Sequence, residues 1–507
     1  MQNSKKDLPV LLLGLCFLGF VFWFSLCNRT LLCKSLQDSS QFRSFQDQIH
    51  ENYTSDDLQH KLDFVNLNGL YARITGRQEL NDVYRTKNGM ITLLMEEQNM
   101  DPLGKNLIRF SESLTTLDIP FLYVQAPYKE DFEDTIFPNG IRCYGNENAD
   151  ALLAQLKTGD VATYDLRPHI NATRDLIDAY YFRTDHHWNV DGAFLGFQHI
   201  CQAVDEILPE SLDLTYTDKS LWQRHTKEDW FLGSRGKRVG IYFSGVDDYS
   251  WLTPTFPTMI TTSIESKGAV FSGDFEAANL RPENVNVKDY FNTNVYCNYI
   301  GGDYGMVRHR NPDAPNPHKL LLIKDSYSLP IQAFLSTVFQ QVEVIDPRYY
   351  PNYDITTYAL ISQPDLVLML MNPSAFPIKE YMDFGRLDPA FANLRPMKEP
   401  RGDLLLPEQN SVNLGYGRVY RLEFEDFITD NPEITQVMAA VMQEGSGKPV
   451  LYQTFDLEQG REAGHFTWLF TTPRHGSARL KLVLLCGTSL YGSGTYRNVT
   501  LSTAALS

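Results

Sequence analysis

The sequence has few cysteines, no metal-binding spacing and no excess of positive charge, and each shortage excludes a class of protein. Its seven cysteines are scattered without a C-x-x-C pair, so neither a disulfide framework nor a structural zinc site is indicated. Cys143, Cys201 and Cys297 could pair in an oxidising compartment, but nothing requires it. With 45 basic against 62 acidic residues and a net charge of -17, the chain is too acidic for a nucleic-acid-binding protein.

Charge is absent from one long stretch, residues 8–27, which read LPVLLLGLCFLGFVFWFSLC. About twenty uncharged residues are enough to span a bilayer as a helix. A cleaved signal peptide would need a shorter apolar core and small residues before its cleavage site, but Phe22, Trp23 and Phe24 stand there. The sequence therefore predicts an uncleaved single-pass anchor in the cell membrane, with the rest of the chain, residues 28–507, expected outside the cytoplasm.

At 507 residues and 43% hydrophobic composition, the chain can bury a large core and form two or three folding units. Composition shifts suggest where these units begin and end. The predicted segments are a cytoplasmic tail (1–7), the anchor (8–27), a polar stalk (28–60), a catalytic domain (61–390) with an insertion at about 209–315, a linker (391–414) and a β-sandwich (415–507).

The most regular part of the chain alternates strands and helices. Residues 320–323, 342–345 and 366–371 read as buried strands, and 330–339 and 355–362 read as the helices between them. This β-α-β-α-β order implies a parallel sheet covered by helices on both faces.

Similar elements are expected earlier in the chain. A helix at residues 105–117 leads into the apolar run FLYV at 121–124, and residues 161–166 form another predicted strand. Asp191 is in the position to cap a helix over residues 192–208.

The last hundred residues contain strand-like runs separated by turn residues and no helical pattern. They lie at residues 419–424, 437–442, 451–455, 466–470, 482–485 and 499–502. Short strands without helices predict a β-sandwich.

The first segment that could carry chemistry is Lys324-Asp325-Ser326-Tyr327-Ser328, between a predicted strand and a predicted helix. A serine at the carboxyl end of a parallel strand lies where α/β sheets bind their ligands. It also faces the amino end of the next helix, whose free N–H groups favour developing negative charge. A simple Asp-Ser turn that caps the helix is the alternative.

The second is Thr184-Asp185-His186-His187-Trp188-Asn189, just before a helix. A serine nucleophile needs a base, and the base needs an acid that fixes its tautomer. If this segment is extended, Asp185 and His187 point to the same side and His186 points away. The alternatives are a helix-capping turn with surface histidines and metal binding by Asp185 with both histidines, although no H-E-x-x-H motif or third ligand set accompanies them.

Together, TDHHWNVDGAF and the later LLLIKDSYSLP resemble the DHHW family and the alginate O-acetyltransferase proteins of the SGNH-hydrolase superfamily. The likeness extends over FLGSRGKRVG, YFSGVDDYSWLTP and NYIGGDYGMV, and covers roughly residues 60–385. It implies a flavodoxin-like α/β sandwich that is circularly permuted, because the serine block follows the Asp/His block. It also implies that Ser326 is the nucleophile, His187 the general base and Asp185 its orienting acid.

The resemblance implies acetyl transfer to or from hydroxyls of a bacterial cell-surface polysaccharide through an acyl-Ser326 intermediate, without a cofactor. The acyl group would reach the outside through a membrane-bound O-acyltransferase partner. A carbohydrate esterase with the same triad, and a catalytically silent glycan-binding or scaffold protein, are the alternatives. The silent alternative is favoured by residues 346–350 (DPRYY), which lack the oxyanion-hole glycine of SGNH enzymes.

Several further residues are candidates for substrate contacts. Asn372, after the strand at 366–371, and Tyr327, beside the nucleophile, are candidates for the oxyanion hole or substrate, although Asn372 fits an Asn-Pro turn equally well. Flat aromatic side chains stack on sugar rings. The candidates for such platforms are Trp222, Trp230 and Trp251 in the insertion and Trp468 and Tyr496 in the C-terminal region. The segment GSRGKR at residues 233–238 lacks the spacing of a phosphate-binding loop and is rejected as one.

Overall fold

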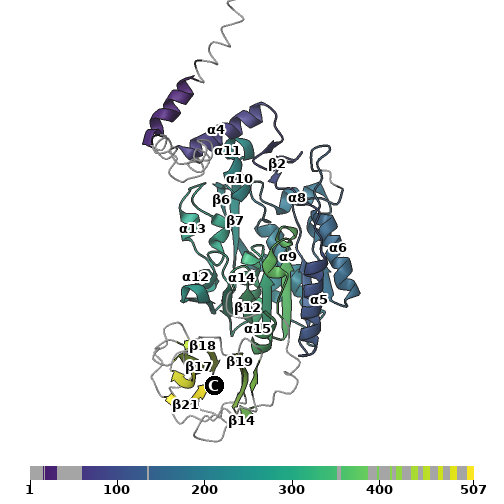
Figure 1. The fold of residues 1–507 in the computed structure, drawn as a ribbon, viewed down its shortest axis with the longest axis vertical. Helices are drawn as coiled ribbons and strands as arrows, with labels where there is room; N and C mark the ends of the chain where they lie inside the picture. The colour runs from purple at the N-terminus through teal and green to yellow at the C-terminus, as the bar shows by residue number, and fades with distance from the viewer. Residues whose placement is uncertain are drawn as a thin grey trace, which may run out of the picture.

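The structure is a computed structural model that describes residues 15, 18–30, 33, 60–133, 136–350, 355–362 and 364–385. From residue 386 onwards it describes only the backbone of strands. The account below concerns these residues (Figure 1).

The centre of the molecule is an eight-stranded mixed sheet with the order β5-β4-β13-β11-β12-β10-β8-β9. Across the sheet, the strands are β5 (Ala162–Asp165), β4 (Phe121–Gln125), β13 (Leu366–Met371), β11 (Asn316–Lys324), β12 (Phe339–Ile345), β10 (Met306–Arg310), β8 (Ile260–Ile264) and β9 (Ala269–Gly273). The first five are parallel and the last three are antiparallel. The predicted parallel β-α-β-α-β arrangement is therefore confirmed.

Helices cover both faces of this sheet, as the burial of β11 shows. Leu320 and Leu322 share a core with α9 (Val190–Asp205) and α14 (Ser328–Val338). The alternate residues Leu321 and Ile323 share another core with α5 (Asp101–Thr115), α6 (Gly145–Thr158) and α15 (Ile355–Ser362). Side chains alternate across a strand, so both faces of β11 are buried, and the unit is a three-layer α/β domain.

Shorter elements surround these layers. The helices are α4 (Lys61–Ile74), α7 (Arg167–Ile170), α8 (Arg174–Tyr180), α10 (Ser234–Val239), α11 (Ile241–Ser244), α12 (Phe275–Asn279) and α13 (Glu283–Asn286). The strands β1 (Glu79–Leu80), β2 (Val83–Arg85) and β3 (Ile91–Thr92) form a small sheet, and β6 (Trp222–Phe231) pairs with β7 (Asp247–Pro254).

The span predicted as an insertion, residues 209–315, is more integrated than expected. It contributes β8, β9 and β10 to the main sheet, where β10 pairs with β12. Short strands were expected in this span, but their positions could not be assigned because they are polar: β8 reads ITTSI and β10 reads MVRHR. Their threonines and charged residues lack the continuous apolar signal that marks the parallel strands.

The helix predicted after the DHHW segment is present, but its cap is different. Asn189, not Asp191, is the N-cap of α9, and its side chain accepts hydrogen bonds from the N–H groups of Asp191 and Gly192 at 2.9 and 3.1 Å. Asp191 instead pairs with Lys219 at 2.7 Å and with Arg224. Asn189 has the extended backbone that an N-cap requires, whereas Asp191 lies inside the first turn.

At the N-terminus, the described part of the predicted anchor, residues 15 and 18–27, is helical. Across the part of the chain that the structure describes, no helix combines the length and apolarity needed to cross a membrane. Most of the predicted stalk, residues 34–59, lies outside the described residues.

The C-terminal region forms two four-stranded sheets. One joins β14, β15, β16 and β19, and the other has the order β18-β17-β20-β21. The strands of the first sheet are β14 (Met397–Lys398), β15 (Ser411–Asn413), β16 (Arg418–Phe424) and β19 (Phe466–Thr471). Those of the second are β18 (Pro449–Asp456), β17 (Gln436–Gln443), β20 (Leu480–Gly487) and β21 (Thr500–Leu506). Each of the six predicted runs overlaps a strand, β14 and β15 lie within the predicted linker, and packing into a sandwich stays a prediction.

Candidate active site

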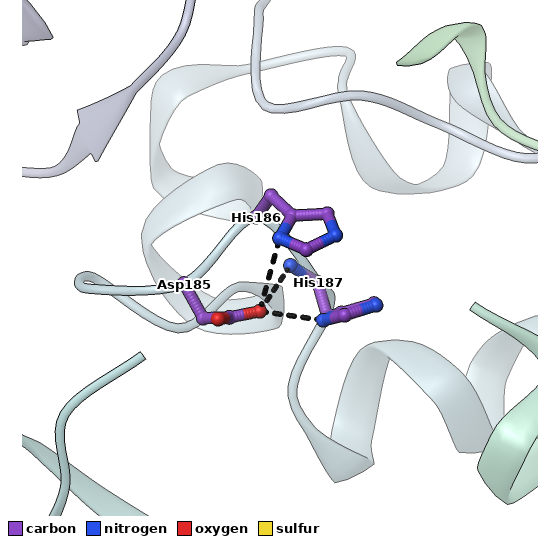
Figure 2. A group of neighbouring side chains, drawn as sticks. All are labelled: Asp185, His186 and His187. Carbon is purple, nitrogen blue, oxygen red and sulfur yellow. Dashed lines mark hydrogen bonds and ion pairs between the residues drawn. The ribbon is translucent and has the colours of Figure 1, made fainter. Parts of the chain in front are cut away.

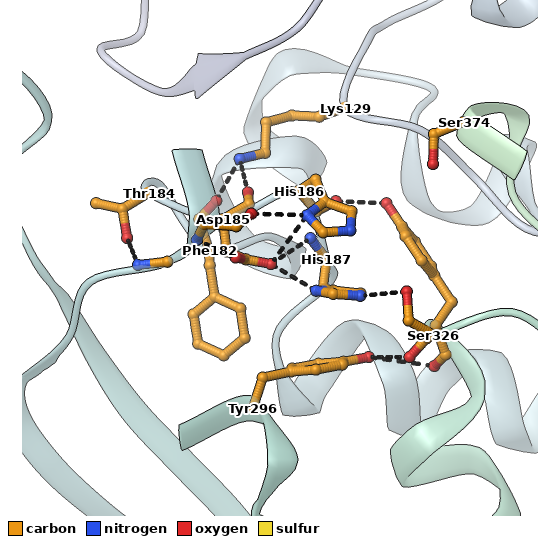
Figure 3. A network of polar contacts seen from close by, with 12 residues as sticks. Lys129, Phe182, Thr184, Asp185, His186, His187, Tyr296, Ser326 and Ser374 are labelled. Carbon is orange, nitrogen blue, oxygen red and sulfur yellow. Dashed lines mark hydrogen bonds and ion pairs between the residues drawn. The ribbon is translucent and has the colours of Figure 1, made fainter. Parts of the chain in front are cut away.

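Three residues predicted from separate parts of the sequence meet at the carboxyl edge of the parallel strands. Ser326 lies in the turn between β11 and α14, and Asp185 and His187 lie in the loop between α8 and α9. The Ser326 hydroxyl is 2.8 Å from His187 Nε2, and His187 Nδ1 is 2.5 Å from Asp185 Oδ1. Figure 3 shows the three side chains in line, with Ser326 facing the imidazole.

Asp185 is buried and accepts hydrogen bonds through both oxygens. Oδ1 accepts from the backbone N–H of His187 at 3.0 Å as well as from its ring, and Oδ2 accepts from the N–H of Ser234 at 2.6 Å. Burial alone would raise the pKa of Asp185, but both histidines and these donors hold it well below its usual value. The carboxylate therefore stays ionised at neutral pH.

This arrangement sets the tautomer of His187. Because Nδ1 faces an ionised carboxylate, it carries the proton and donates it, which leaves Nε2 free to accept the Ser326 O–H. The ring is also held from both sides. Tyr296 stacks on one face with ring centroids 3.8 Å apart, and His186 packs on the other at 3.8 Å.

The expectation that His186 points away from the pair is wrong. Its ring packs on His187, and its Nδ1 lies 3.1 Å from Ser234 Oγ and 3.4 Å from Asp185 Oδ1 (Figure 2). The segment is a tight turn, closed by the hydrogen bond from the His187 N–H to the Asp185 side chain, so the alternation of an extended chain does not apply. Burial and His187 keep the pKa of His186 well below its usual value, so this ring is neutral.

Asp185, His186 and His187 place their ligand atoms within 4.8 Å of one another, which a metal site would also require. However, the two nitrogens of His187 are directed at Asp185 and at Ser326. The arrangement matches an acid-base-nucleophile relay better than a set of convergent ligands.

The turn that holds Ser326 is organised by the buried carboxylate of Asp325. It accepts from the N–H of Tyr327 at 2.9 Å and, across the sheet, from the N–H and side-chain amide of Asn372 at 2.7 and 2.6 Å. Among the described residues, the backbone N–H of Ser326 itself has no protein acceptor. It is therefore the available donor for an oxyanion that forms on a group bound to Ser326.

Asn372 and Tyr327 have structural partners. The Asn372 amide donates to Asp325, its oxygen accepts from the N–H of Ser374 at 2.8 Å, and it caps a short 3-10 turn, as the Asn-Pro alternative predicted. The Tyr327 hydroxyl donates to the backbone oxygen of His186, and its own backbone oxygen accepts from Trp188 Nε1 at 3.0 Å. The hydrogen bonds of both residues thus stabilise the backbone around the site.

Lys129, which follows β4 and is fully buried, was not predicted as a residue of the site. Its ammonium group donates to the backbone oxygens of Ile91 (3.2 Å), Phe182 (2.5 Å), Arg183 (3.3 Å) and Asp185. Burial lowers the pKa of Lys129 to about 8. Three of these four carbonyls belong to the loop that carries Asp185 and His187, so Lys129 fixes that loop.

The segment rejected as a phosphate loop has a different role. The N–H of Gly233 donates to Thr184 Oγ1 at 2.7 Å, and the next N–H, of Ser234, holds Asp185. A Cβ at Gly233 would lie 2.3 Å from Asp185 Cβ, so only glycine allows this approach. On the other side, Asp247 accepts from the N–H and hydroxyl of Thr184 at 2.7 and 2.6 Å.

A buried network of ion pairs lies next to the turn that holds Ser326. Lys324, two residues before Ser326, is fully buried and pairs with Asp303 and, at 3.4 Å, with Asp346. Arg348 joins both carboxylates at 3.2 and 2.6 Å. The loop that lacks the expected glycine thus supplies Asp346 and Arg348, which fix the end of β12 beside the end of β11.

The tryptophans of the insertion are engaged within the fold. Trp222 is buried among the phenylalanines of the core, so the prediction of a sugar platform is wrong for it. Trp230 donates to a backbone oxygen and has the ammonium groups of Lys227 and Lys288 over its ring, and Trp251 stacks on His225. The side chains of Trp468 and Tyr496 lie outside the described residues.

Part of the chain matches a known protein family. Residues 86–228 match the family model of the SGNH hydrolase-like domain of the acetyltransferase AlgX. That span holds Asp185 and His187 and ends before Ser326. The expected resemblance is confirmed over that span: residues 86–228 are similar to an SGNH hydrolase-like domain of an acetyltransferase. No curated protein matches the chain significantly.

Two structures of PatB1 share this fold over about three fifths of the chain. PatB1 of Bacillus cereus is 22% identical with a TM-score of 0.50, over 59% of this chain and 98% of that one. A structure of PatB1 with a sulfonyl adduct is 21% identical with a TM-score of 0.50, over 60% and 97%. A DHHW family protein from Eubacterium siraeum is 18% identical with a TM-score of 0.45, over 59% and 93%.

Proposed function

We propose that this protein transfers acyl groups through a covalent acyl-Ser326 intermediate, with His187 as general base and Asp185 as its orienting acid. One observation carries the proposal: the continuous path from Asp185 Oδ1 through the imidazole to Ser326 Oγ, with steps of 2.5 and 2.8 Å. A serine hydroxyl is a weak nucleophile at neutral pH and needs such a base within hydrogen-bond reach.

The chemistry then follows in two balanced steps. Ser326 Oγ attacks the acyl carbonyl while its proton passes to His187 Nε2, and the oxyanion accepts a hydrogen bond from the Ser326 N–H. The leaving alcohol takes the proton from Nε2 as the acyl-serine forms. In the second step His187 removes the proton of an acceptor hydroxyl, that oxygen attacks the acyl-serine, and the proton returns to Oγ.

The proposed substrate is a cell-surface polysaccharide, to or from whose hydroxyl groups the acetyl group is transferred. Support comes from the match to an acetyltransferase family over residues 86–228. Water in place of the sugar hydroxyl would make the same site an esterase, because the triad acts identically on either acceptor. A membrane-bound O-acyltransferase would supply the acyl group.

The proposed location is the outer face of the cell membrane, with residues 8–27 as the tether. The uncharged run at residues 8–27 supports it, and the proposed polysaccharide substrate would lie on the same side of the membrane. We also infer that the domain is a flavodoxin-like sandwich with a circular permutation, because the Asp185-His187 segment precedes Ser326 in the chain whereas the common SGNH order is the reverse.

The triad is tested by single and double substitutions with a chromogenic acetate ester. Ser326→Ala and His187→Ala should each lower turnover by roughly 10³-fold or more, and the double variant should lose little beyond either one, because the members act as a unit. Mass spectrometry should find an acetyl group on Ser326 in the wild type. Adding a soluble polysaccharide then separates transfer from hydrolysis.

Two controls sharpen this test. Ser328→Ala changes a neighbouring buried serine outside the relay and should retain activity. His186→Ala removes a ring that packs on His187 but carries no proton, so it should cost less than His187→Ala. Wild-type turnover in Ser326→Ala would refute the covalent mechanism and favour a silent, glycan-binding protein.

A further inference from the structure

Exposed apolar side chains are concentrated at one end of the molecule. Of the eighteen large hydrophobic residues that are exposed in the described part of the chain, twelve lie in the N-terminal helical segment or in α4. The twelve are Leu15, Leu18, Phe20, Val21, Phe22, Trp23, Leu26, Leu62, Leu67, Leu70, Tyr71 and Ile74. A contiguous apolar surface of this kind marks an interaction site on a protein.

Helix α4 is apolar on two opposite faces. Its inner face packs on α10 and α11: a Cβ at Gly69 would lie 2.2 Å from the Val239 oxygen, and Ala72 is fully buried. The outer face is formed by Leu67, Leu70, Tyr71 and Ile74, which share a helix side because they are three or four residues apart. They are between 36% and 75% exposed, so the fold of the domain accounts only for the inner face.

The outer face continues into the N-terminal helical segment. The ring of Phe64 in α4 lies 5.6, 5.4 and 5.1 Å from those of Phe20, Trp23 and Phe24. These three residues belong to the uncharged run at residues 8–27. The exposed side of α4 is therefore an extension of the apolar surface of the proposed tether.

We infer that α4 lies along the surface of a lipid bilayer, with Leu67, Leu70, Tyr71 and Ile74 at the boundary between headgroups and acyl chains. The inference rests on the tether proposed above, which brings α4 to the membrane. A helix with one exposed apolar face lies in the interface in this way, and a tyrosine at that depth keeps its hydroxyl in water. A second contact beside the tether would fix the orientation of the domain.

In Figure 1, α4 and the N-terminal helix lie at one end of the long axis, and the C-terminal strands lie at the other. With α4 on the bilayer, the C-terminal sheets point away from the membrane. The domain with Ser326 lies between them.

The test uses the full chain in phosphatidylcholine–phosphatidylglycerol vesicles that contain a phospholipid with a diazirine in its acyl chain. After photolysis, mass spectrometry maps the lipid adducts. Residues 67–74 should be labelled about fivefold more than Val270 and Val287, which are as exposed but lie elsewhere on the domain.

Two matched double variants complete the experiment. Leu67→Glu/Ile74→Glu should reduce labelling of α4 to the level of Val270 and Val287 while hydrolysis of a soluble ester is retained. Val270→Glu/Val287→Glu should leave labelling of α4 unchanged.

The pattern of labelling distinguishes membrane contact of α4 from membrane contact of residues 8–27. Labelling of residues 8–27 without labelling of α4 would overturn the membrane contact of α4 and retain the tether. No labelling of either segment would overturn both. In a parallel sample treated with a protein cross-linker, links between residues 67–74 of two copies would show that a second copy covers this face, and would also overturn the inference.

Discussion

At the scale of single residues, the loop with Asp185 and His187 depends on one buried ammonium group. Lys129 donates to four backbone oxygens and has no carboxylate within ion-pair distance among the described residues. Carbonyl groups stabilise a buried charge less than an ion pair does, which is why burial lowers its pKa to about 8. A lysine is suited to this position because its three N–H donors radiate from a single nitrogen.

A stability prediction follows from this pKa. The pKa of Lys129 is lower in the folded state than in the unfolded state. Burying the charged lysine therefore destabilises the folded protein at low pH, and the free energy of unfolding increases as the pH rises and the folded lysine loses its proton. The stability of the wild type relative to Lys129→Met should increase by about 3 kcal/mol from about pH 7 to about pH 10.5. Urea unfolding at both pH values measures the difference. A difference independent of pH would mean that Lys129 is not buried as a cation.

At the scale of elements, Asp185 and His187 are held by segments that contribute no side chain to the proposed relay. The turn at Gly233 and Ser234 presents two consecutive N–H groups to Thr184 and Asp185. The approach is close because a hydrogen replaces a side chain at Gly233. The position of Asp185 is thus set by a backbone that lies about fifty residues further along the chain.

Substitutions in this turn should separate backbone from side-chain effects. Gly233→Ala introduces a methyl group into the space of Asp185 and should lower turnover of the acetate ester by roughly 10²-fold or more, because the base loses its orientation. Ser234→Ala keeps the N–H that holds Asp185 and removes only the hydroxyl near His186, so its effect should be small. Equal losses in both variants, with folding unchanged by circular dichroism, would contradict this account.

The sequence predicted the elements whose physical signal is local. Strands β11, β12 and β13 are continuous apolar runs because both of their faces are buried, and this pattern is visible without a structure. Strand β8, with the sequence ITTSI, has little apolar signal of its own and is specified by its pairing with β9 and β10. Such pairing between distant segments leaves no trace in a short window of sequence.

The same distinction applies to the site. Ser326, His187 and Asp185 could be predicted because their residue types and their positions beside strands and helices limit their chemistry. Lys129 and Gly233 could not, because they act on the backbone and the Cβ of residues far away in the sequence. His186 was misplaced because an extended segment was assumed where the chain makes a tight turn.

At the scale of the whole molecule, the chemistry and the C-terminal sheets belong to different parts of the chain. The described contacts of the triad come from residues 129–326, whereas the C-terminal strands begin at Met397. The main sheet is already complete with β13, which ends at Met371. The C-terminal region is therefore not needed to assemble the relay.

Removal of residues 391–507 should therefore leave hydrolysis of a small acetate ester within about twofold of the full chain, since the relay is intact. Transfer to a polysaccharide should fall further if the C-terminal sheets hold the polymer, because binding at a second site raises the local concentration of acceptor. Both rates can be compared in parallel on the same preparations. Loss of ester hydrolysis in a folded truncated protein would show that the C-terminal region supports the active site itself.

The stacking of His187 between Tyr296 and His186 has a consequence for motion. A ring covered on both faces cannot rotate about its side-chain bonds or tilt without moving a neighbour, so the displacement left to it lies within its own plane. Within that plane, the hydrogen bonds at Nδ1 and Nε2 restrain the ring along the line from Asp185 to Ser326. The imidazole is therefore restrained by neighbours on both faces and at both nitrogens, and its displacements in an atomic-resolution crystal structure should be smaller than those of an exposed histidine such as His60.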